Sequence, residues 1–481
     1  MKQWRWGVRT AAISVLALVI AGCSSGAGGR ENDVSAIDLN TPITLKVAHF
    51  NDQVFNQTYG NLIRAKYPNV DFEVISTMGI AGEGEDPLQA FEELVAEQQP
   101  DLLIMSEAQY ETLAASGGLS ELESMMGQSG FDTGELTEGV VEQLRQLGGG
   151  KLYGLAPTFS AQALYYNKAL FDQYSVPYPT DGMTWEEVLA LAGRFKSEGS
   201  DDTRVYGLAH SMFAGSPFDL VKQIASSMAL SHLNADATAL TMENDGWKEA
   251  FRMAVEAYTS KSTNMPEAMQ MDAGGKATRA IRIGGDSDLF NAGRAAMIID
   301  GPNLLNQRNF RPPGAEEQAA IDLGIVTMPV DADYPDLTSS YDVSQIFGIG
   351  ASSGQAEAAW DIVAYVNGTD FANIRSKSVT ELQTRRGFET GKDGIDLSPF
   401  YKLKPNGAQE AKLLPKGFTQ SFDTIANEEL KAAVDGSKTV DEAFASLVSR
   451  SAEALAEASL SGEKESGGGI GGGRISAVFV G

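Results

Sequence analysis

The residue types that most often carry catalysis are scarce in this sequence. It contains three histidines, His49, His210 and His232, and a single cysteine, Cys23. The histidines are far apart and have none of the spacings, such as His-Glu-x-x-His, that hold a metal ion. There is no Gly-x-Ser-x-Gly motif for a nucleophilic serine. Among 64 acidic residues, a carboxylate pair for glycoside hydrolysis is not excluded by counting, but no motif singles one out. We therefore expect no enzyme, no metal and no organic cofactor.

Cys23 directly follows a stretch that has the pattern of an N-terminal leader. Three basic residues lie among the first nine positions, and Ala11–Ala21 is apolar but too short to span a membrane. Ile20–Cys23 resembles a bacterial lipobox, in which the cysteine receives a lipid and becomes the mature N-terminus. We predict a lipoprotein signal peptide over residues 1–22 and a flexible Gly- and Ser-containing tether over residues 23–40. A plain secretory leader with an incidental cysteine is the alternative.

The formal net charge of −27 limits the partners of this 481-residue chain. Such acidity repels nucleic acid and anionic lipid surfaces, so we expect no nucleic-acid partner and membrane contact through the lipid anchor only. Anionic substrates are not excluded, because a local basic pocket can override net charge. The apolar fraction of 43% is ample for a core, and the length suits two domains or one large two-lobed domain.

Three apolar runs near the N-terminus have the character of strands. Ile43–His49 alternates apolar with polar residues, and Val70–Ile75 and Asp101–Met105 follow it with helical patterns between them. Strands separated by helices predict a parallel sheet, whose ligands lie beyond the carboxyl ends of the strands. The ligand-binding candidates at these ends are Asn51, Asp52, Gln53, Ser106 and Glu107. Asp52 and Glu107 could equally do no more than cap the following helices.

The passage Ala163–Ser197 contains an unusually clear helix start. Thr184 and Glu187 have capping-box spacing after a Tyr-rich run and a Pro-containing loop. The pattern YYNKALF, loop, TWEEVLALAGRFK resembles the extracellular solute-binding proteins of ABC importers, in the group that includes maltose- and multiple-sugar-binding proteins. Two later passages resemble the same family in the expected order, namely FNAGRAAMIIDGPN at Phe290–Asn303 and AAWDIVAYVNG at Ala358–Gly368.

This resemblance implies an α/β, two-lobed fold like that of periplasmic binding proteins. Each lobe would be a mostly parallel sheet flanked by helices, with the ligand cleft between the lobes. Lobe 1 would comprise residues 41–154 and 330–372, and lobe 2 residues 155–329 and 373–460. Residues 461–481 are Gly-rich and show no periodicity, so we expect a disordered tail.

The resemblance and the expected loops add further candidates for ligand binding. Phe159 and Ser160 follow KLYGLAP, which resembles the strand by which the family's chain leaves lobe 1 for lobe 2. The remaining candidates are Met212, Phe213, Phe218, Asn303, Tyr341 and Asp342. For any one residue of the loop at 210–218, burial in the core is the alternative. Asn303 departs from the family pattern, because maltose-type members carry at this position a tryptophan that stacks on a sugar ring.

These features together predict a monomeric binding protein. It would be lipid-anchored on the outer face of a bacterial cytoplasmic membrane and would capture a carbohydrate, with an oligosaccharide favoured, by hinged closure. The resemblance implies delivery of the solute to ABC permease subunits that are driven by a separate ATPase. The alternatives are a non-sugar solute, a sensing or adhesion lipoprotein without transport, and a secreted glycan hydrolase.

Overall fold

The structure of this protein is a computed structural model. It describes residues 37–38, 41–82, 85–195, 200, 203–211, 216–266, 288–307, 321–377, 381–391, 394–407 and 413–466. The predicted signal peptide, Cys23 and the tether apart from residues 37–38 therefore lie outside the described residues. Within the tether, Ile37 is buried and its N–H donates to Asp361 at 2.8 Å.

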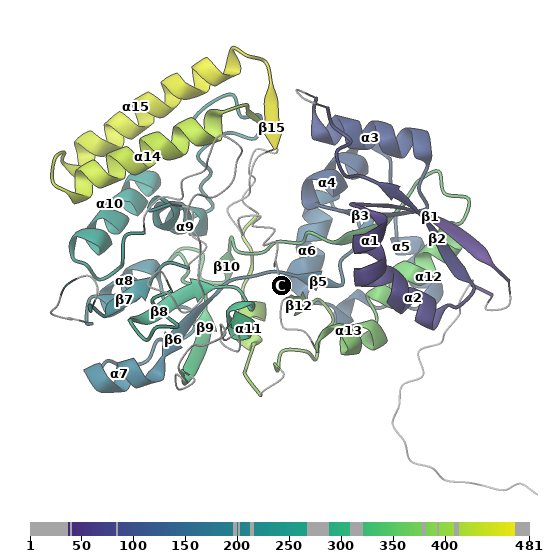
Figure 1. The fold of residues 1–481 in the computed structure, drawn as a ribbon, viewed down its shortest axis with the longest axis horizontal. Coiled ribbons are helices and arrows are strands. Elements are labelled where there is room, and N and C mark those ends of the chain that lie inside the picture. Colours follow the sequence, from purple (N-terminus) through teal and green to yellow (C-terminus); the bar gives the residue numbers. More distant parts are fainter. Residues whose placement is uncertain are drawn as a thin grey trace, which may run out of the picture. The chain divides into compact units, whose positions relative to one another are not determined.

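The first sheet has five strands. In spatial order they are β2 (Val70–Ser76), β1 (Ile43–His49), β3 (Leu102–Met105), β11 (Ile346–Ile349) and β4 (Gly154–Leu155). Figure 1 labels β1, β2 and β3 of this sheet. β1 pairs in parallel with β2 and β3, which confirms the three strands predicted from the N-terminal apolar runs. β11 is antiparallel to both β3 and β4.

Helices pack around this first sheet and bury its apolar side chains in one core with their own. They are α1 (Asp52–Phe55), α2 (Asn61–Lys66), α3 (Pro87–Gln98), α4 (Glu107–Ser116), α5 (Glu123–Ser129), α6 (Glu138–Leu147), α12 (Ala356–Val366) and α13 (Thr369–Arg375). A π-helical turn at Asn56–Gly60 joins α1 to α2. Phe55, Tyr59 and Ile63 lie four residues apart and are buried, as the helical pattern after the first strand predicts.

The second sheet has four strands. In order they are β7 (Tyr206–Ala209), β8 (Ala295–Asp300), β6 (Ala163–Asn167) and β9 (Leu323–Thr327). Its helices are α7 (Lys168–Tyr174), α8 (Trp185–Ala192), α9 (Asp219–Ser227), α10 (Asp245–Thr259), α11 (Leu304–Gln307), α14 (Phe418–Val434) and α15 (Val440–Ser459). The predicted capping box is present, because Thr184 and Glu187 each bind the other's backbone N–H.

The expectation of mostly parallel sheets needs a correction, because both sheets are mixed. β7 and β8 are parallel, whereas β6 is antiparallel to β8 and β9. The physical reason is the edge at which the chain enters each sheet when it comes from the other sheet. β6 begins at the edge where β8 ends, and β11 begins at the edge where β3 ends. A strand that enters at the carboxyl edge of its neighbours has to run against them.

Short strand pairs complete the fold. β5 (Thr158–Phe159) pairs with β12 (Leu382–Gln383), β10 (Leu337–Thr338) with β13 (Lys404–Pro405), and β14 (Leu413–Pro415) with β15 (Lys464–Ser466). β15 thus lies within the residues predicted as a disordered tail. Among the described residues, no helix has both the length and the apolarity needed to cross a membrane.

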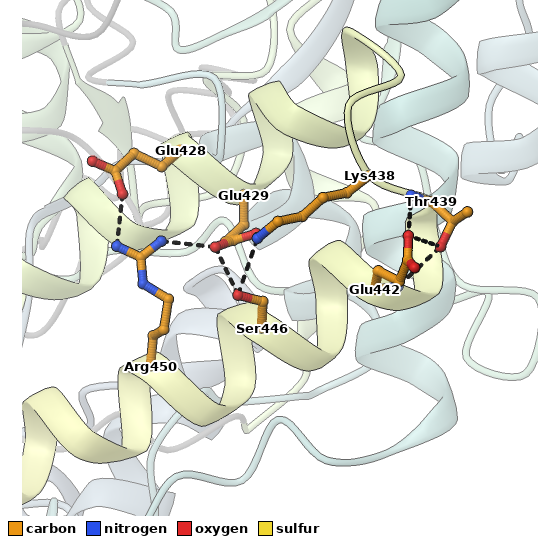
Figure 2. Close-up of polar contacts among 7 residues, drawn as sticks. All are labelled: Glu428, Glu429, Lys438, Thr439, Glu442, Ser446 and Arg450. Atoms are coloured by element: carbon orange, nitrogen blue, oxygen red, sulfur yellow. Dashed lines mark hydrogen bonds and ion pairs between the residues drawn. The ribbon is translucent and has the colours of Figure 1, made fainter.

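α14 and α15 pack side by side and share a buried acid (Figures 1 and 2). The side chain of Glu429 on α14 is 3% exposed and binds Lys438 at 2.5 Å, Arg450 at 2.7 Å and Ser446 at 2.8 Å. Burial alone would raise the pKa of Glu429, but the hydrogen bonds from these partners outweigh it and lower the pKa. A capping box of Thr439 and Glu442 starts α15 beside this cluster.

Candidate functional site

The carboxyl end of β1 leads directly into a helix cap. The Asn51 side chain accepts the N–H of Val54 at 2.8 Å, so its oxygen is used to start α1. Asp52 and Gln53 follow in the first turn and are exposed. Asp52 also accepts a hydrogen bond from the Asn56 amide at 2.8 Å. At this edge the structure therefore leaves Asp52 and Gln53 accessible to a solute, with Asn51 serving as the cap.

The carboxyl end of β3 carries Ser106 and Glu107. Ser106 is the cap of α4, in a capping box with Gln109. Glu107 instead points to other elements, since its Oε1 accepts the N–H of Val343 at 2.9 Å and the amide N–H of Gln143 on α6. Burial raises the pKa of Glu107 to about 7, the Val343 N–H opposes this shift, and the nearby negative charges of Asp342 and Glu111 add to it.

Two segments of the chain cross between the sheets, residues 156–162 from β4 to β6 and residues 328–345 from β9 to β11. These crossing segments are paired with each other beside Glu107. Ser160 and Asp342 exchange backbone hydrogen bonds of 2.9 Å in both directions. The ring of Phe159 stacks on that of Tyr341 at 5.1 Å, and the Tyr341 hydroxyl donates to the carbonyl of Leu403 at 2.9 Å. Ser160 is exposed and Asp342 is half-buried, so both remain candidates for ligand contact. Phe159 is 2% exposed and serves to pack the crossing.

The matching edge of the second sheet is formed where β7 and β8 end. Asp300 is the last residue of β8, and its Oδ1 accepts the N–H of Gly301 at 2.7 Å. Burial raises the pKa of Asp300 to about 6. Hydrogen bonds from Ser211 and Gly301 lower this pKa in part, and the negative charge of Asp288 raises it further. Asn303 follows two residues after Gly301 and is exposed.

His210 follows β7 at this same edge. Its Nε2 lies 2.7 Å from the Tyr258 hydroxyl, which donates to the carbonyl of Pro217 at 2.7 Å. The ring nitrogen therefore donates to the hydroxyl oxygen. Burial lowers the pKa of His210 to about 4. A neutral histidine held in this way ties the end of β7 to Tyr258 on α10 and carries no charge at neutral pH.

The structure brings most of the predicted residues to these two edges and to the crossing segments, and it places one of them in the core. Phe218 is completely buried against Phe251 and Phe422, so its ring is a core residue and is not open to a ligand. Met212 and Phe213 lie outside the described residues.

The two edges are linked through the crossing segments. Ser160 pairs with Asp342, whose neighbour Val343 binds Glu107. On the other side of the crossing, the Tyr165 hydroxyl donates to the carbonyl of Gly301 at 2.9 Å. The candidate site is therefore defined as the two strand edges and the crossing segments between them.

Two residues at these edges were missed by the sequence interpretation. Asp300 could have been found by applying the rule of carboxyl strand ends to β8 as well as to β1 and β3. Phe50, which directly follows β1, is 52% exposed. An aromatic residue at the end of an alternating strand pattern was the available signal.

The chemistry of this arrangement is hydrogen bonding by carboxylates, amides and hydroxyls. Within the described ranges, no group of three or more His, Cys, Asp or Glu side chains is placed to hold a metal ion. The exposed groups Asp52, Gln53, Ser160 and Asn303 can offer both donors and acceptors to a polar solute.

Comparison with known sequences identifies relatives. A model of the family described as bacterial extracellular solute-binding protein matches residues 55–372. A curated protein of Brucella abortus, whose name refers to binding without naming a ligand, is 26% identical over 284 residues. These residues make up 58% of this chain and 62% of that protein, so the chain spans less than two thirds of the curated relatives it matches.

Solved structures share the fold over most of the chain. UspC of M. tuberculosis is 16% identical with a TM-score of 0.61, covering 86% of this chain and 100% of that one. The sugar-binding protein MalE of Xanthomonas citri is 17% identical with a TM-score of 0.59, covering 87% and 98%. A sugar transporter of Rhizobium etli in an open conformation is 17% identical with a TM-score of 0.58, covering 85% and 99%.

The sequence comparison and the structure comparison both agree with the arrangement of two sheets and two crossing segments described above. The structural likeness extends over both sheets and shows a two-lobed α/β fold. The family is one of solute-binding proteins and not of enzymes. Because the family model covers more than half of the sequence, the chain belongs to the family of bacterial extracellular solute-binding proteins.

Proposed function

We propose that this protein captures a carbohydrate, with an oligosaccharide favoured, between its two lobes and delivers it to ABC permease subunits that a separate ATPase drives. The observation that carries the proposal is the pairing of Ser160 with Asp342. It places two crossing segments side by side between the strand edges of the two sheets. A solute that contacts both edges would favour the closed form by its differential affinity for it.

The carbohydrate assignment is supported by the side chains at the edges. Carboxylate and amide groups such as those of Asp52, Gln53 and Asn303 bind hydroxyl groups by accepting and donating hydrogen bonds. The exposed ring of Phe50 could pack against the apolar face of a sugar ring. Solved structures of similar fold include a sugar-binding protein and a sugar transporter by name, which agrees with this choice.

The anchoring is a separate part of the proposal. Lipidation of Cys23 would hold the monomeric protein on the outer face of the cytoplasmic membrane, and the leader sequence supports this. Palmitate labelling of the wild type that is lost in Cys23→Ser would support the anchor. Equal labelling of both proteins would contradict it.

A thermal-shift screen of the full-length protein in detergent tests the ligand class. The screen would compare mono- and oligosaccharides, uronides, amino acids and peptides. A ligand at 100 times its Kd adds about 2.7 kcal/mol of stability, which is readily detected. A shift confined to saccharides would support the proposal. A shift with another solute class would overturn the carbohydrate assignment, and silence throughout would favour a sensing or adhesion lipoprotein.

Two variants link the screen to the site. Asp52→Ala and Asn303→Ala should each weaken the saccharide-induced shift. The matched control is Glu186→Gln, which changes an exposed residue in the first turn of α8. Unchanged affinity in both site variants would contradict the assignment of these edges as the binding site.

A further inference from the structure

Glu107 connects three parts of the chain that are distant in sequence. It lies in the first turn of α4, its Oε1 accepts the amide N–H of Gln143 on α6, and the same oxygen accepts the backbone N–H of Val343 at 2.9 Å. Val343 is fully buried. The carboxyl group therefore fixes a buried backbone N–H of the crossing segment to two helices of the first lobe.

The segment that Glu107 holds is also tied to the other crossing segment. Tyr341 stacks on Phe159, and Asp342 pairs with Ser160. Beyond Val343 the chain enters β11 in the first sheet. Residues 341–343 thus have the other crossing segment on one side and the Glu107 carboxyl on the other, which is the position of a hinge.

The hydrogen bonding of Glu107 depends on its proton. An ionised carboxylate can only accept, and it binds N–H donors more strongly than a neutral acid does. A protonated carboxyl can also donate. The Oε1 atom of Gln143 is buried and has no hydrogen-bond partner among the residues that the structure describes, so a rotated Gln143 amide would offer this oxygen to a protonated Glu107. Each protonation state would then have its own arrangement of the Gln143 amide.

We propose that Glu107 is a positioning residue of the hinge, whose ionisation tightens the hold on Val343 and so sets the position of the crossing segment. Through that segment, the closing of the lobes would depend on pH. This last step rests on the closure function proposed above, whereas the tie between Glu107 and Val343 does not.

The surroundings of Glu107 place the transition near neutral pH. The charged groups that act on it are Glu111 on α4 and Asp342 on the crossing segment, and both oppose its ionisation. From α6 it receives the uncharged amide of Gln143. Together with burial, these neighbours give the carboxyl a pKa of about 7.

The amide proton of Val343 reports directly on this tie. We would follow its chemical shift by NMR in the full-length, deuterated protein from about pH 5 to about pH 9, a range that brackets the transition. In the wild type we expect a downfield shift as the pH rises, with a midpoint near neutrality. Glu107→Gln should abolish this transition. Glu111→Gln should move its midpoint to lower pH, because a like charge is removed.

The matched control is Glu186→Gln, the same substitution at an exposed position of α8, which should leave the midpoint unchanged. A Val343 shift that does not titrate, or one that still titrates in Glu107→Gln, would overturn the proposal. If Glu107→Gln does not fold, an unmoved midpoint in Glu111→Gln would overturn it in the same way.

Lobe movement is measured separately, from distances between spin labels on α3 and α15 at the two ends of the pH range. A wild-type distance that changes with pH and is constant in Glu107→Gln supports the coupling to closure, and an invariant wild-type distance refutes that coupling. The NMR result stands whatever the saccharide screen finds, so failure of the tie and failure of the proposed function are distinguishable.

Discussion

Replacing Glu107 by glutamine should flatten part of the pH dependence of stability. The folded state raises the pKa of this carboxyl from 4.5 to about 7. Because the folded state binds the proton more tightly than the unfolded chain, the wild type loses stability as the pH rises from about 4.5 through about 7. The shift of 7 − 4.5 = 2.5 pH units corresponds to about 3 kcal/mol at 1.36 kcal/mol per unit.

Glutamine has nearly the same shape and removes the ionisation. Its oxygen can still accept the N–H of Val343, and its N–H group can meet the unpartnered oxygen of Gln143. The variant should therefore keep, above neutral pH, the free energy of unfolding that the wild type loses. At about pH 5 the two proteins should be similar in stability, since Glu107 is then largely protonated.

Urea unfolding followed by tryptophan fluorescence measures this difference. The free energy of unfolding would be determined at about pH 5 and about pH 8.5 for the wild type, Glu107→Gln and the exposed control Glu186→Gln. The wild type and the control should lose about 2.5 kcal/mol more than Glu107→Gln between these two pH values, because the unfolded carboxyl is already partly ionised at about pH 5. Equal losses in all three proteins would refute the assignment of the raised pKa to the half-buried Glu107 carboxyl.

Three further predictions concern elements around the site. Glu429→Ala should lower the free energy of unfolding at neutral pH by about 2 kcal/mol, because Lys438 and Arg450 lose their buried partner but can still reach water. Because the pKa of Glu429 is lowered in the folded state, the wild type should lose this contribution as the pH falls below about 4.5. A difference in the free energy of unfolding between wild type and variant that does not depend on pH would contradict this. Phe218→Ala should lower the free energy of unfolding in urea by about 3–5 kcal/mol, since the ring is fully buried. A variant that is as stable as the wild type but binds ligand more weakly would show instead that Phe218 contacts the ligand. Tyr341→Phe leaves the Leu403 carbonyl without its hydroxyl donor and should cost about 1 kcal/mol, which a thermal melt can detect, and an unchanged melting temperature would show that this bond adds nothing.

The strands and helix starts were predictable because their signals are local. The alternation in Ile43–His49 depends only on neighbouring residues, and β1 occupies the same residues. The capping box of Thr184 and Glu187 needs two side chains three residues apart, and it was confirmed. Such patterns report which face of an element is buried. They do not report what buries it.

The roles of the site residues depend on contacts that are distant in sequence. Glu107 followed a predicted strand, but its role comes from Val343 and Gln143, which no local pattern connects to it. Phe218 was a ligand candidate with burial in the core as the alternative, and the alternative is confirmed because Phe251 and Phe422 from two other helices cover its ring. Asp300 was overlooked because the rule of carboxyl strand ends was applied to β1 and β3 and not to β8.

The position of β11 in the first sheet has a consequence for the order of assembly. β11 lies between β3 and β4, and both of these strands precede it in the chain by most of the second lobe. Until Ile346–Ile349 has been synthesised, the edge of β3 and the edge of β4 that it covers have no partner in the sheet. Pairing over such a sequence separation is slow. A nascent chain of this protein therefore completes its first lobe late.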